Sequence, residues 1–323
     1  MKITPQQRAL GIALLSGLLG LHFVVRYLQH LPLGAPGSDI DQLWWMAREI
    51  VRGQNPYVTD RALRLFPTAI YYPLTAGIVA LPIALLGLVP MRFVFVTGSA
   101  VLFGYAIGRS RPYLWPTLIG MPFLVSLGSA QWTPLLATAI LWPALGWVAV
   151  AKPNLGLAML AGAPTRRDAL TLVGGGLGIV LVSLAISPGW PNDWLTALRG
   201  SVHFHPLIFR PGGFLVLLAA LRWRDPDARL VLALGLVPVT GLMYDMLPAC
   251  LACRTRAQAA VLALISYIPW ATITSASNLA DQMWENGETT LWFGLLPAAG
   301  IVLLRWLPEV RFLGWLRDSS IKE

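Results

Sequence analysis

The chain alternates between long apolar runs and short polar connections. Nearly charge-free windows occur at residues 9–25, 70–89 and 169–186, and a helix needs about 20 such residues to cross the hydrocarbon of a bilayer. Inside lipid every backbone donor and acceptor must be paired within the protein, so only helices or a closed barrel can cross. Barrel strands alternate polar and apolar positions, whereas these runs are continuous. The pattern therefore predicts membrane-spanning α-helices.

The predicted fold is all-α, a single polytopic transmembrane domain over residues 1–323 with about 10–12 membrane helices. The first span is expected at 9–27 and to remain uncleaved. Several later segments are too short to cross alone, and segment 230–253 contains Pro238, Gly241 and Pro248. Broken helices at membrane depth usually line a protein-enclosed cavity. The further spans are expected at 69–89, 92–108, 112–128, 132–150, 153–164, 169–187, 212–223, 230–253, 257–276 and 290–307.

Two polar stretches are predicted as loops outside the cytoplasm. The first, residues 29–66, contains a helical pattern at 39–52 in which Trp44 and Trp45 suit the membrane–water interface. The second loop covers residues 188–212. Lys2 and Arg8 before the first span hold the N-terminus inside, which puts both loops on the opposite side.

Charge is scarce, since 12% of the residues are charged and 56% are hydrophobic, yet the net charge is +9. On a soluble chain this excess would suggest nucleic acid; here it is better explained by basic cytoplasmic loops, and membrane lipid is the expected partner. The expected spans assign these cations to the inside: Arg92, Arg166, Arg167, Arg222, Arg224, Arg229, Arg254, Arg256, Arg305 and Arg311. They assign these to the outside: Arg26, Arg48, Arg52, Arg61, Arg64, Arg109, Arg111, Lys152, Arg199 and Arg210. The outside cations can serve a phosphorylated substrate.

Ionisable residues at membrane depth or at the membrane face are candidates for function. Asp39 opens the first outer loop and can act either as a general base or as the cap of the helix that follows; Asp41 is expected to be a helper or a cap. Lys152, between two apolar segments, either extends to the interface or binds phosphate. Asp245 follows Tyr244 among apolar residues, and a buried carboxylate needs a partner or a proton.

Other polar clusters have a structural explanation beside a functional one. Residues 53–57 and 71–74 are typical of a turn followed by an aromatic belt at the interface. His203 and His205 could pair on a metal, but the chain has only two other histidines, so no metal and no cofactor are expected. Cys250 and Cys253 have C-x-x-C spacing in an apolar stretch without the surroundings of a redox motif.

The order of these clusters produces a resemblance. The run Ser38-Asp39-Ile40, Trp44, Ala47-Arg48, Gly53-Gln54-Asn55-Pro56-Tyr57 and Tyr72-Pro73-Leu74 resembles the start of the family 87 membrane glycosyltransferases of the GT-C superfamily. Further matches are Gln131, Lys152-Pro153, Trp194, Tyr244-Asp245 and Leu247-Pro248. The chain departs from the family in two places. The family commonly has glycine directly before the glutamine, whereas Gly128 stands three residues before it, and Leu74 replaces a frequent second proline.

The resemblance implies a GT-C-like enzyme of the cell envelope that transfers a sugar, typically mannose, from a polyprenyl-phosphate donor. The acceptor would be a glycolipid or glycan at the outer face of the cytoplasmic membrane, with Asp39 as the base. Lys152, His203, His205 and Arg210 are the cations expected at the donor phosphate. The expected substrate cavity contains Tyr57, Tyr72, Gln131, Tyr244 and Asp245. A transporter or flippase of a lipid-linked anion, and a non-catalytic subunit of a membrane complex, are the competing hypotheses.

Overall fold

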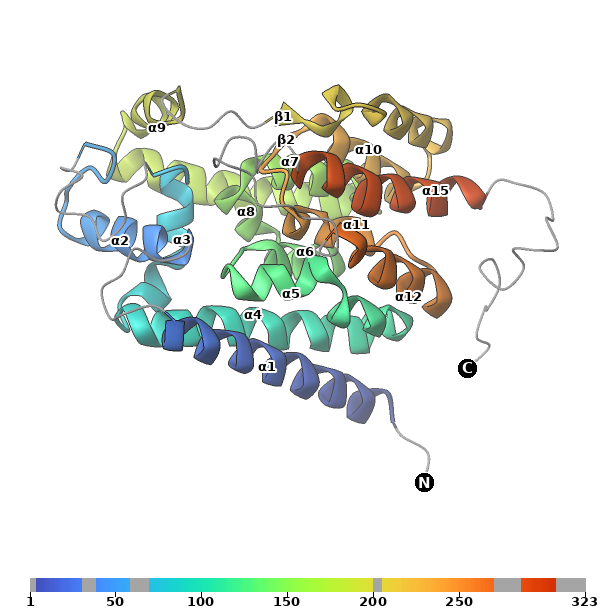
Figure 1. Ribbon diagram of the computed structural model, residues 1–323. Helices are drawn as coiled ribbons and strands as arrows, with labels where there is room; N and C mark the ends of the chain where they lie inside the picture. The colour runs from blue at the N-terminus through green and yellow to red at the C-terminus, as the bar shows by residue number, and fades with distance from the viewer. Residues whose placement is uncertain (1–3, 31–38, 59–69, 200–204, 270–285, 306–323) are drawn as a thin grey trace.

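The computed structural model describes residues 4–30, 39–58, 70–199, 205–269 and 286–305, and these are almost entirely helical (Figure 1). The described strands form one antiparallel pair of two residues each, β1 (His205–Pro206) and β2 (Pro238–Val239), with His205 opposite Val239. The prediction of an all-α fold is therefore confirmed.

Four described helices are long and apolar enough to cross a membrane, judged by length and composition. They are Pro5–Arg26, Leu88–Ser110, Arg166–Ile186 and Asn286–Leu304. The first three belong to α1 (Pro5–His30), α4 (Leu88–Ser110) and α8 (Arg166–Ile186), and the last contains the π-helical turn η7 (Leu291–Leu295) and α15 (Leu296–Leu304). Their length and composition support the prediction that this chain is a membrane protein.

The other elements are short, and proline begins many of them. The α-helices are α2 (Asp39–Val51), α3 (Leu74–Ala84), α5 (Met121–Gly128), α6 (Thr133–Leu141), α7 (Pro153–Ala161), α9 (Trp190–Arg199), α10 (Pro226–Leu236), α11 (Leu247–Cys250) and α12 (Arg256–Ile265). The 3₁₀-helices are η2 (Pro112–Ile119), η3 (Pro143–Ala151), η4 (Leu207–Phe209), η5 (Gly213–Arg222) and η6 (Met243–Met246). Proline suits a first helical turn, where its missing N–H has no intrahelical partner, but it ends a preceding helix.

Three of the 3₁₀-helices are unusually long, since η2, η3 and η5 have eight, nine and ten residues. A 3₁₀-helix rises about 2.0 Å per residue against about 1.5 Å for an α-helix, and runs beyond four residues are uncommon. The tighter winding therefore lets a short apolar segment reach further along the bundle. By this measure the eight residues of η2 extend about 16 Å, against about 12 Å for an α-helix of the same number of residues.

Glycine and serine bring α1 and α4 into close antiparallel contact. A Cβ atom on Gly104 would lie 2.5 Å from the Cβ of Ser16, and one on Gly108 would lie 2.6 Å from the Cα of Ala9. The Ser16 hydroxyl donates a hydrogen bond of 2.6 Å to the carbonyl of Ala100. Small residues and interhelical hydroxyl bonds are the usual means by which apolar helices associate in lipid, where burial of apolar surface gives no driving force.

This antiparallel pair defines two ends of the molecule. The Asp39 end contains the end of α1, the start of α4 and helices α2, α3 and α9, which lie together at the left of Figure 1. The Asp225 end contains the start of α1 and the end of α15 at the right, where Arg305 contacts Asp225 at 2.7 Å. Intervening segments run between the two: α6 starts beside the Asp39 end and finishes where Trp142 meets Tyr105 of α4.

The arrangement corrects the predicted span count at residues 69–89. This window is not one crossing, because α3 ends at Ala84 and a turn at Gly87 leads directly into α4. Arg92, expected inside, is buried at the Asp39 end. Arg109 and Arg111, expected outside, lie at the Asp225 end, where Arg111 is 3.9 Å from Asp227. An apolar window of 20 residues cannot by itself distinguish a crossing from a short helix that turns back.

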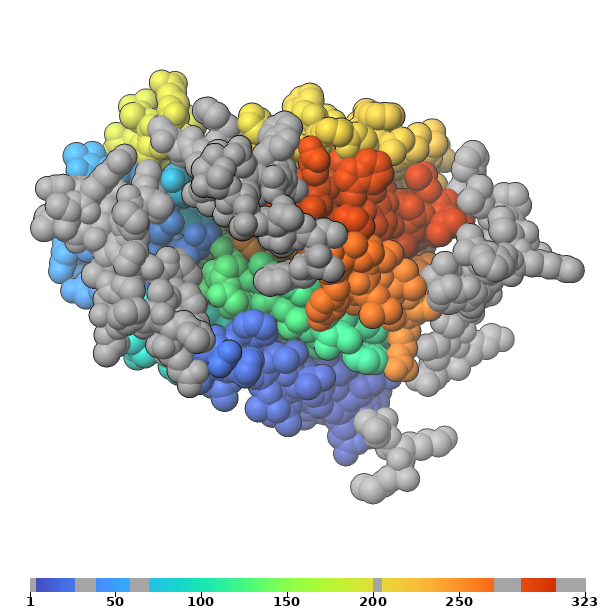
Figure 2. Space-filling view, viewed as in Figure 1, coloured from blue at the N-terminus to red at the C-terminus, as the bar shows by residue number. Residues whose placement is uncertain are grey.

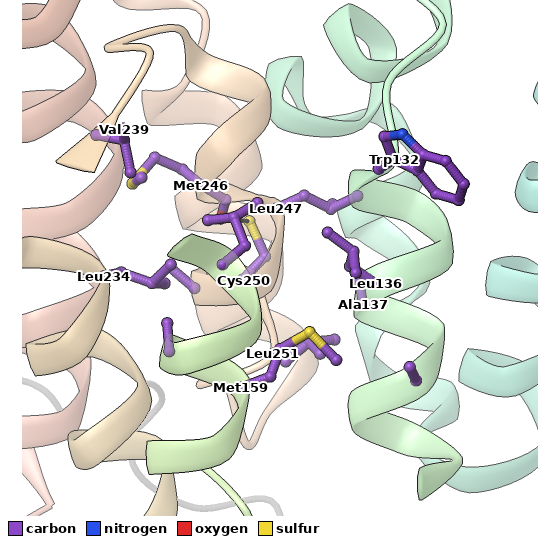
Figure 3. Close-up of a cluster of buried hydrophobic side chains, with 14 of the residues drawn as sticks. Trp132, Leu136, Ala137, Met159, Leu234, Val239, Met246, Leu247, Cys250 and Leu251 are labelled. Atoms are coloured by element: carbon purple, nitrogen blue, oxygen red, sulfur yellow. Dashed lines mark hydrogen bonds between the residues drawn. The ribbon is translucent and has the colours of Figure 1, made fainter. Parts of the chain in front are cut away.

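Helix α2 confirms the helical pattern expected at 39–52, and it packs on α3 and α4. The core continues between α6 and α11, where Leu136 and Ala137 face Leu247 and Leu251 (Figure 3). On the face seen in Figure 2, α1 borders α5, and α12 lies between η2 and α15. Many leucine and valine side chains of α1 and α8 are exposed, as is suitable for a lipid-facing surface.

The close contact between α1 and α4 can be tested by a substitution in α4, with a control variant in the same helix. Gly104→Ala should destabilise the protein by about 1–3 kcal/mol, because the added methyl group has no space against Ser16. Gly98→Ala should be neutral or slightly stabilising, since nothing lies within 4 Å of that position. The stability of both variants is measured by thermal unfolding in detergent. Equal effects would mean that α1 and α4 do not pack closely at Gly104.

Candidate functional site

Asp39 is the first residue of α2, and two side chains from separate parts of the chain hold its carboxylate. The Tyr72 hydroxyl donates to Oδ2 at 3.0 Å, and Gln131 Nε2 donates to the same oxygen at 2.6 Å. Within the described residues Oδ1 has no hydrogen-bond partner, and Asp39 is only partly buried. One carboxylate oxygen is thus anchored, and the other remains available as an acceptor.

Gln131 reaches Asp39 from a strained turn between α5 and α6. Its backbone N–H donates to the carbonyl of Ser126 at 2.8 Å, the closing bond of a helix C-terminus. Ala130, directly before it, has φ +50°, a left-handed conformation that normally favours glycine. The Oε1 atom of Gln131 has no hydrogen-bond partner in the described structure. The residue is only 3% exposed, so this oxygen is buried. This acceptor is a polar group that the described fold leaves unsatisfied.

A second layer of contacts holds the backbone around Tyr72. The Tyr57 hydroxyl donates to the Tyr72 carbonyl at 2.9 Å, and the indole N–H of Trp194 donates to the Tyr71 carbonyl at 2.9 Å. Asn55 Nδ2 donates to Asp193 Oδ2 at 2.5 Å, which joins the turn after α2 to α9. Tyr57 therefore acts here through the backbone of Tyr72, and α9 braces the same segment.

Asp41 faces the opposite way from Asp39 and is fully paired. Arg92 donates from Nε to Oδ1 at 2.8 Å and from Nη2 to Oδ2 at 2.6 Å. Both side chains are almost completely buried. A bidentate guanidinium–carboxylate pair of this kind is geometrically specific and strong. Arg92 was missed by the sequence analysis, although a buried carboxylate in an apolar setting signals that a cation must lie nearby.

Lys152 and Asp245 form a second buried ion pair. Lys152 Nζ lies 2.6 Å from Asp245 Oδ1 and 4.6 Å from the centre of the Tyr244 ring. The other carboxylate oxygen accepts from the backbone N–H and the hydroxyl of Thr240, at 2.9 and 2.6 Å. The need of Asp245 for a partner, expected from its apolar surroundings, is met by Lys152. Thr240 is a second partner that the sequence did not suggest.

The two clusters lie close enough for their charges to interact. Burial raises the pKa of the Tyr72 phenol, and the Asp39 carboxylate and Asp245 raise it further. The charges of both Asp245 and Asp39 also act on the buried Tyr244 phenol. The Tyr72 phenol therefore stays protonated at neutral pH, as its donation to Asp39 requires. Asp39, Tyr72, Gln131, Tyr244, Asp245 and Lys152 thus form one polar region toward the Asp39 end.

The remaining expected phosphate ligands are more scattered. His205 is exposed on β1, and Arg210 is buried after η4, where burial lowers the pKa of its guanidinium and nearby Glu288 opposes this effect. His203 lies outside the described residues. No described contact joins His205 or Arg210 to Lys152. Their roles at a phosphate stay predictions.

A small cavity opens between α5, η6 and the start of the last long helix. Its volume is about 170 Å³, and it is lined by Val125, Leu242, Met243, Pro269, Asn286, Thr289 and Thr290. The lining combines apolar side chains with the polar groups of Asn286 and the two threonines. Met243 directly precedes Tyr244 in η6, but none of the six residues of the polar region lines the cavity. Within the described part of the chain, no three His, Cys, Asp or Glu side chains gather to hold a metal ion.

Comparison with protein-family models, with curated proteins and with solved structures finds no match for this chain.

The Lys152–Asp245 pair predicts a coupled loss of stability. Lys152→Met should cost about 3–5 kcal/mol, because it leaves Asp245 buried without its counter-charge. Lys152→Met combined with Asp245→Asn should recover most of that loss, since the amide oxygen still accepts from Thr240. The exposed cation Arg199 is the control, and Arg199→Met should change stability by less than about 0.5 kcal/mol. Unfolding in detergent is the measurement, and a double variant no better than the single one would refute the coupling.

Proposed function

We propose that this chain is a multi-pass membrane glycosyltransferase in which Asp39 is the general base. It would transfer a sugar, which we propose to be mannose, from a polyprenyl-phosphate donor to a glycolipid or glycan acceptor. The observation that carries the proposal is the state of the Asp39 carboxylate. Oδ2 is fixed by Tyr72 and Gln131, while Oδ1 has no described partner and belongs to a partly exposed residue.

The geometry fits the proton transfer that such a reaction requires. The acceptor hydroxyl would give its proton to Asp39 Oδ1 as its oxygen bonds to the anomeric carbon of the donor sugar. The bond from that carbon to the phosphate oxygen breaks, and polyprenyl phosphate leaves with the electron pair. Because the carboxylate is anchored through its other oxygen, it is positioned in advance for this step. No nucleotide is needed, since the donor already carries a phosphate leaving group.

The family resemblance gains support from how the matching residues are arranged. Asp39, Tyr72 and Gln131 come from three separated parts of the matching pattern, and they meet at one oxygen atom. The family commonly has glycine directly before the glutamine, and the residue in that position, Ala130, adopts a conformation that favours glycine. The departure in sequence is therefore compatible with the same turn.

Lys152 can assist at the phosphate while it remains paired with Asp245. An ammonium group has three donors, and one described hydrogen bond, to Asp245, occupies it. A donor phosphate would share Lys152 with Asp245 instead of replacing it. Asp41 is left out of the reacting groups because both of its oxygens are held by Arg92. Its proposed task is to fix α2.

A transporter or flippase of a lipid-linked anion is the second candidate. It is favoured by the buried Lys152–Asp245 pair, which lies between broken segments in the manner of coupling sites in transporters. A transporter needs no base, however, and does not explain why Asp39 is anchored on one oxygen. The two hypotheses therefore differ in the effect of removing the basicity of Asp39.

The charge distribution supports an orientation with Asp39 outside the cytoplasm. The described residues of the Asp225 end include three aspartates, Asp168, Asp225 and Asp227, and eleven arginines: Arg8, Arg109, Arg111, Arg166, Arg167, Arg222, Arg224, Arg229, Arg254, Arg256 and Arg305. The described residues of the Asp39 end carry seven cations, Arg26, Arg48, Arg52, Arg92, Lys152, Arg199 and Arg210, against six carboxylates. An excess of arginine marks the cytoplasmic side. The corrected positions of Arg92, Arg109 and Arg111 strengthen this bias.

Replacing Asp39 tests the proposed enzyme. Asp39→Asn keeps the shape of the side chain and removes its basicity, so transfer from labelled polyprenyl-phosphate mannose in membranes should fall by about 10²–10⁴-fold. Donor binding should persist, because the substitution leaves the phosphate ligands intact. Asp168→Asn, the same change at the other end, should keep the wild-type rate. Transfer near the wild-type rate in the Asp39 variant would rule out its role as base.

Accessible cysteines test the orientation. In a background with Cys250 and Cys253 replaced by alanine, single cysteines at Arg109, Arg166 and Asn192 occupy exposed positions. An impermeant thiol reagent applied to intact cells should label position 192, and should label 109 and 166 only after lysis. Labelling of 109 together with 192 would contradict the two ends as described, and labelling of 109 and 166 alone would reverse the orientation.

A further inference from the structure

Arg229 ties two loops together at the Asp225 end. Its guanidinium donates to the carbonyls of Ala161 and Ala163 at 2.7 and 2.9 Å, at the end of α7. The same group donates to the carbonyls of Trp223 and Arg224 at 3.1 and 3.4 Å, just after η5. A guanidinium presents its donors in a rigid planar fork, so these contacts fix one loop relative to the other.

The tie places two pairs of arginines on neighbouring loops. Arg166 and Arg167 start α8, directly after the first loop, and Arg222 and Arg224 flank Trp223 in the second. Arg166, Arg167 and Arg224 are exposed, and Arg222 is half-buried. Within the described part of the chain none of these four arginines is ion-paired.

The nearby carboxylates are engaged elsewhere. Asp225 and Asp227 are buried and are held by Arg254 and Arg305 at 2.7–3.3 Å. Asp168 accepts a hydrogen bond from the Thr165 hydroxyl at 2.7 Å in the cap of α8. None of the four arginines is therefore paired with a described carboxylate. We call Arg166, Arg167, Arg222 and Arg224 the arginine patch.

Apolar side chains surround the arginine patch. Trp223, between two of its arginines, is 59% exposed, and Leu221 before it is 67% exposed. On the other side Leu170 and Val173 of α8 are 60% and 48% exposed. A binding site for a free, soluble anion has no need of this apolar surface. An acyl chain attached to the anion would cover it, and tryptophan is enriched at the level of lipid headgroups.

We propose that the arginine patch binds the headgroup phosphate of an anionic phospholipid in the adjacent leaflet. Guanidinium groups bind phosphate oxygens through paired hydrogen bonds, and basic clusters between membrane helices recognise anionic lipids in this way. The exposed side chains of α8 and η5 take the acyl chains. This site lies at the opposite end of the molecule from Asp39 and is independent of sugar transfer.

The test measures lipid retained by the full chain. The protein is placed in a bilayer of equal parts phosphatidylglycerol and phosphatidylcholine. Native mass spectrometry then measures the mass of the protein with the lipid that stays bound to it in the gas phase. The wild-type chain should retain phosphatidylglycerol preferentially. Arg166→Gln with Arg167→Gln, and separately Arg222→Gln with Arg224→Gln, should each reduce that retention, by about fivefold for each arginine removed.

Matched controls separate a site from general attraction. Arg26→Gln with Arg199→Gln removes the same charge from exposed positions at the Asp39 end and should leave retention unchanged. A variant with Arg166→Lys, Arg167→Lys, Arg222→Lys and Arg224→Lys keeps the positive charge at every position. It should therefore retain more lipid than the Gln variants. Equal loss in the control pair would overturn the proposal. Displacement of the lipid by millimolar inorganic phosphate would also overturn it, because the ligand would then be a soluble anion.

Discussion

The buried contact between Asp41 and Arg92 is the interaction on which the candidate site depends. Successive residues of an α-helix are rotated by about 100°, so Asp39 and Asp41 point in nearly opposite directions from the first turn of α2. Arg92 binds both oxygens of Asp41 and thereby fixes α2 against the start of α4. The same rotation turns Asp39 toward Tyr72 and Gln131. Two aspartates with the same chemistry thus have different tasks, because one is fully neutralised by a cation and the other is only held by neutral donors. The first aspartate therefore helps to fix the helix that carries the second.

Short elements make this arrangement possible. An uninterrupted helix pairs all of its interior backbone groups and therefore presents only side chains, whereas a broken segment brings its ends and turns to membrane depth. Gln131 lies in such a turn, between α5 and α6, and Asp245 lies in η6 beside the turn at Gly241. In both places a polar side chain meets a partner from another segment, since an unpaired polar group would be costly in apolar surroundings. The proline residues that divide the chain into short helices therefore also determine where its polar chemistry can lie.

The sequence predicted the helical class, the first long helix and the helical segment after Asp39, because each depends on local pattern. It failed where the result depends on counting crossings. Residues 70–89 are apolar throughout, but the turn at Gly87, with φ +95°, sends the chain back without crossing, and this reversed the expected sides of Arg92 and Arg111. The contacts among Asp39, Tyr72 and Gln131 span up to 92 residues of sequence. No periodicity reports such a contact, so only the family resemblance suggested that these residues belong together.

The two ends of the molecule use charge in different ways. At the Asp39 end the main ion pairs are buried, and each joins elements that are distant in sequence. At the Asp225 end Asp225 and Asp227 are shared by Arg254 and Arg305. Burial alone would raise the pKa of Asp225, but Arg305, the backbone N–H of Asp227 and Arg254 together lower it. The carboxyl therefore stays ionised at neutral pH and joins the start of α10 to the end of the last helix. Pairing satisfies these aspartates and leaves a surplus of arginine among the described residues of this end. Anionic headgroups would balance that surplus if the proposed lipid site is correct, while the Asp39 end, nearly neutral among the described residues, would not strongly repel the negatively charged donor that we propose.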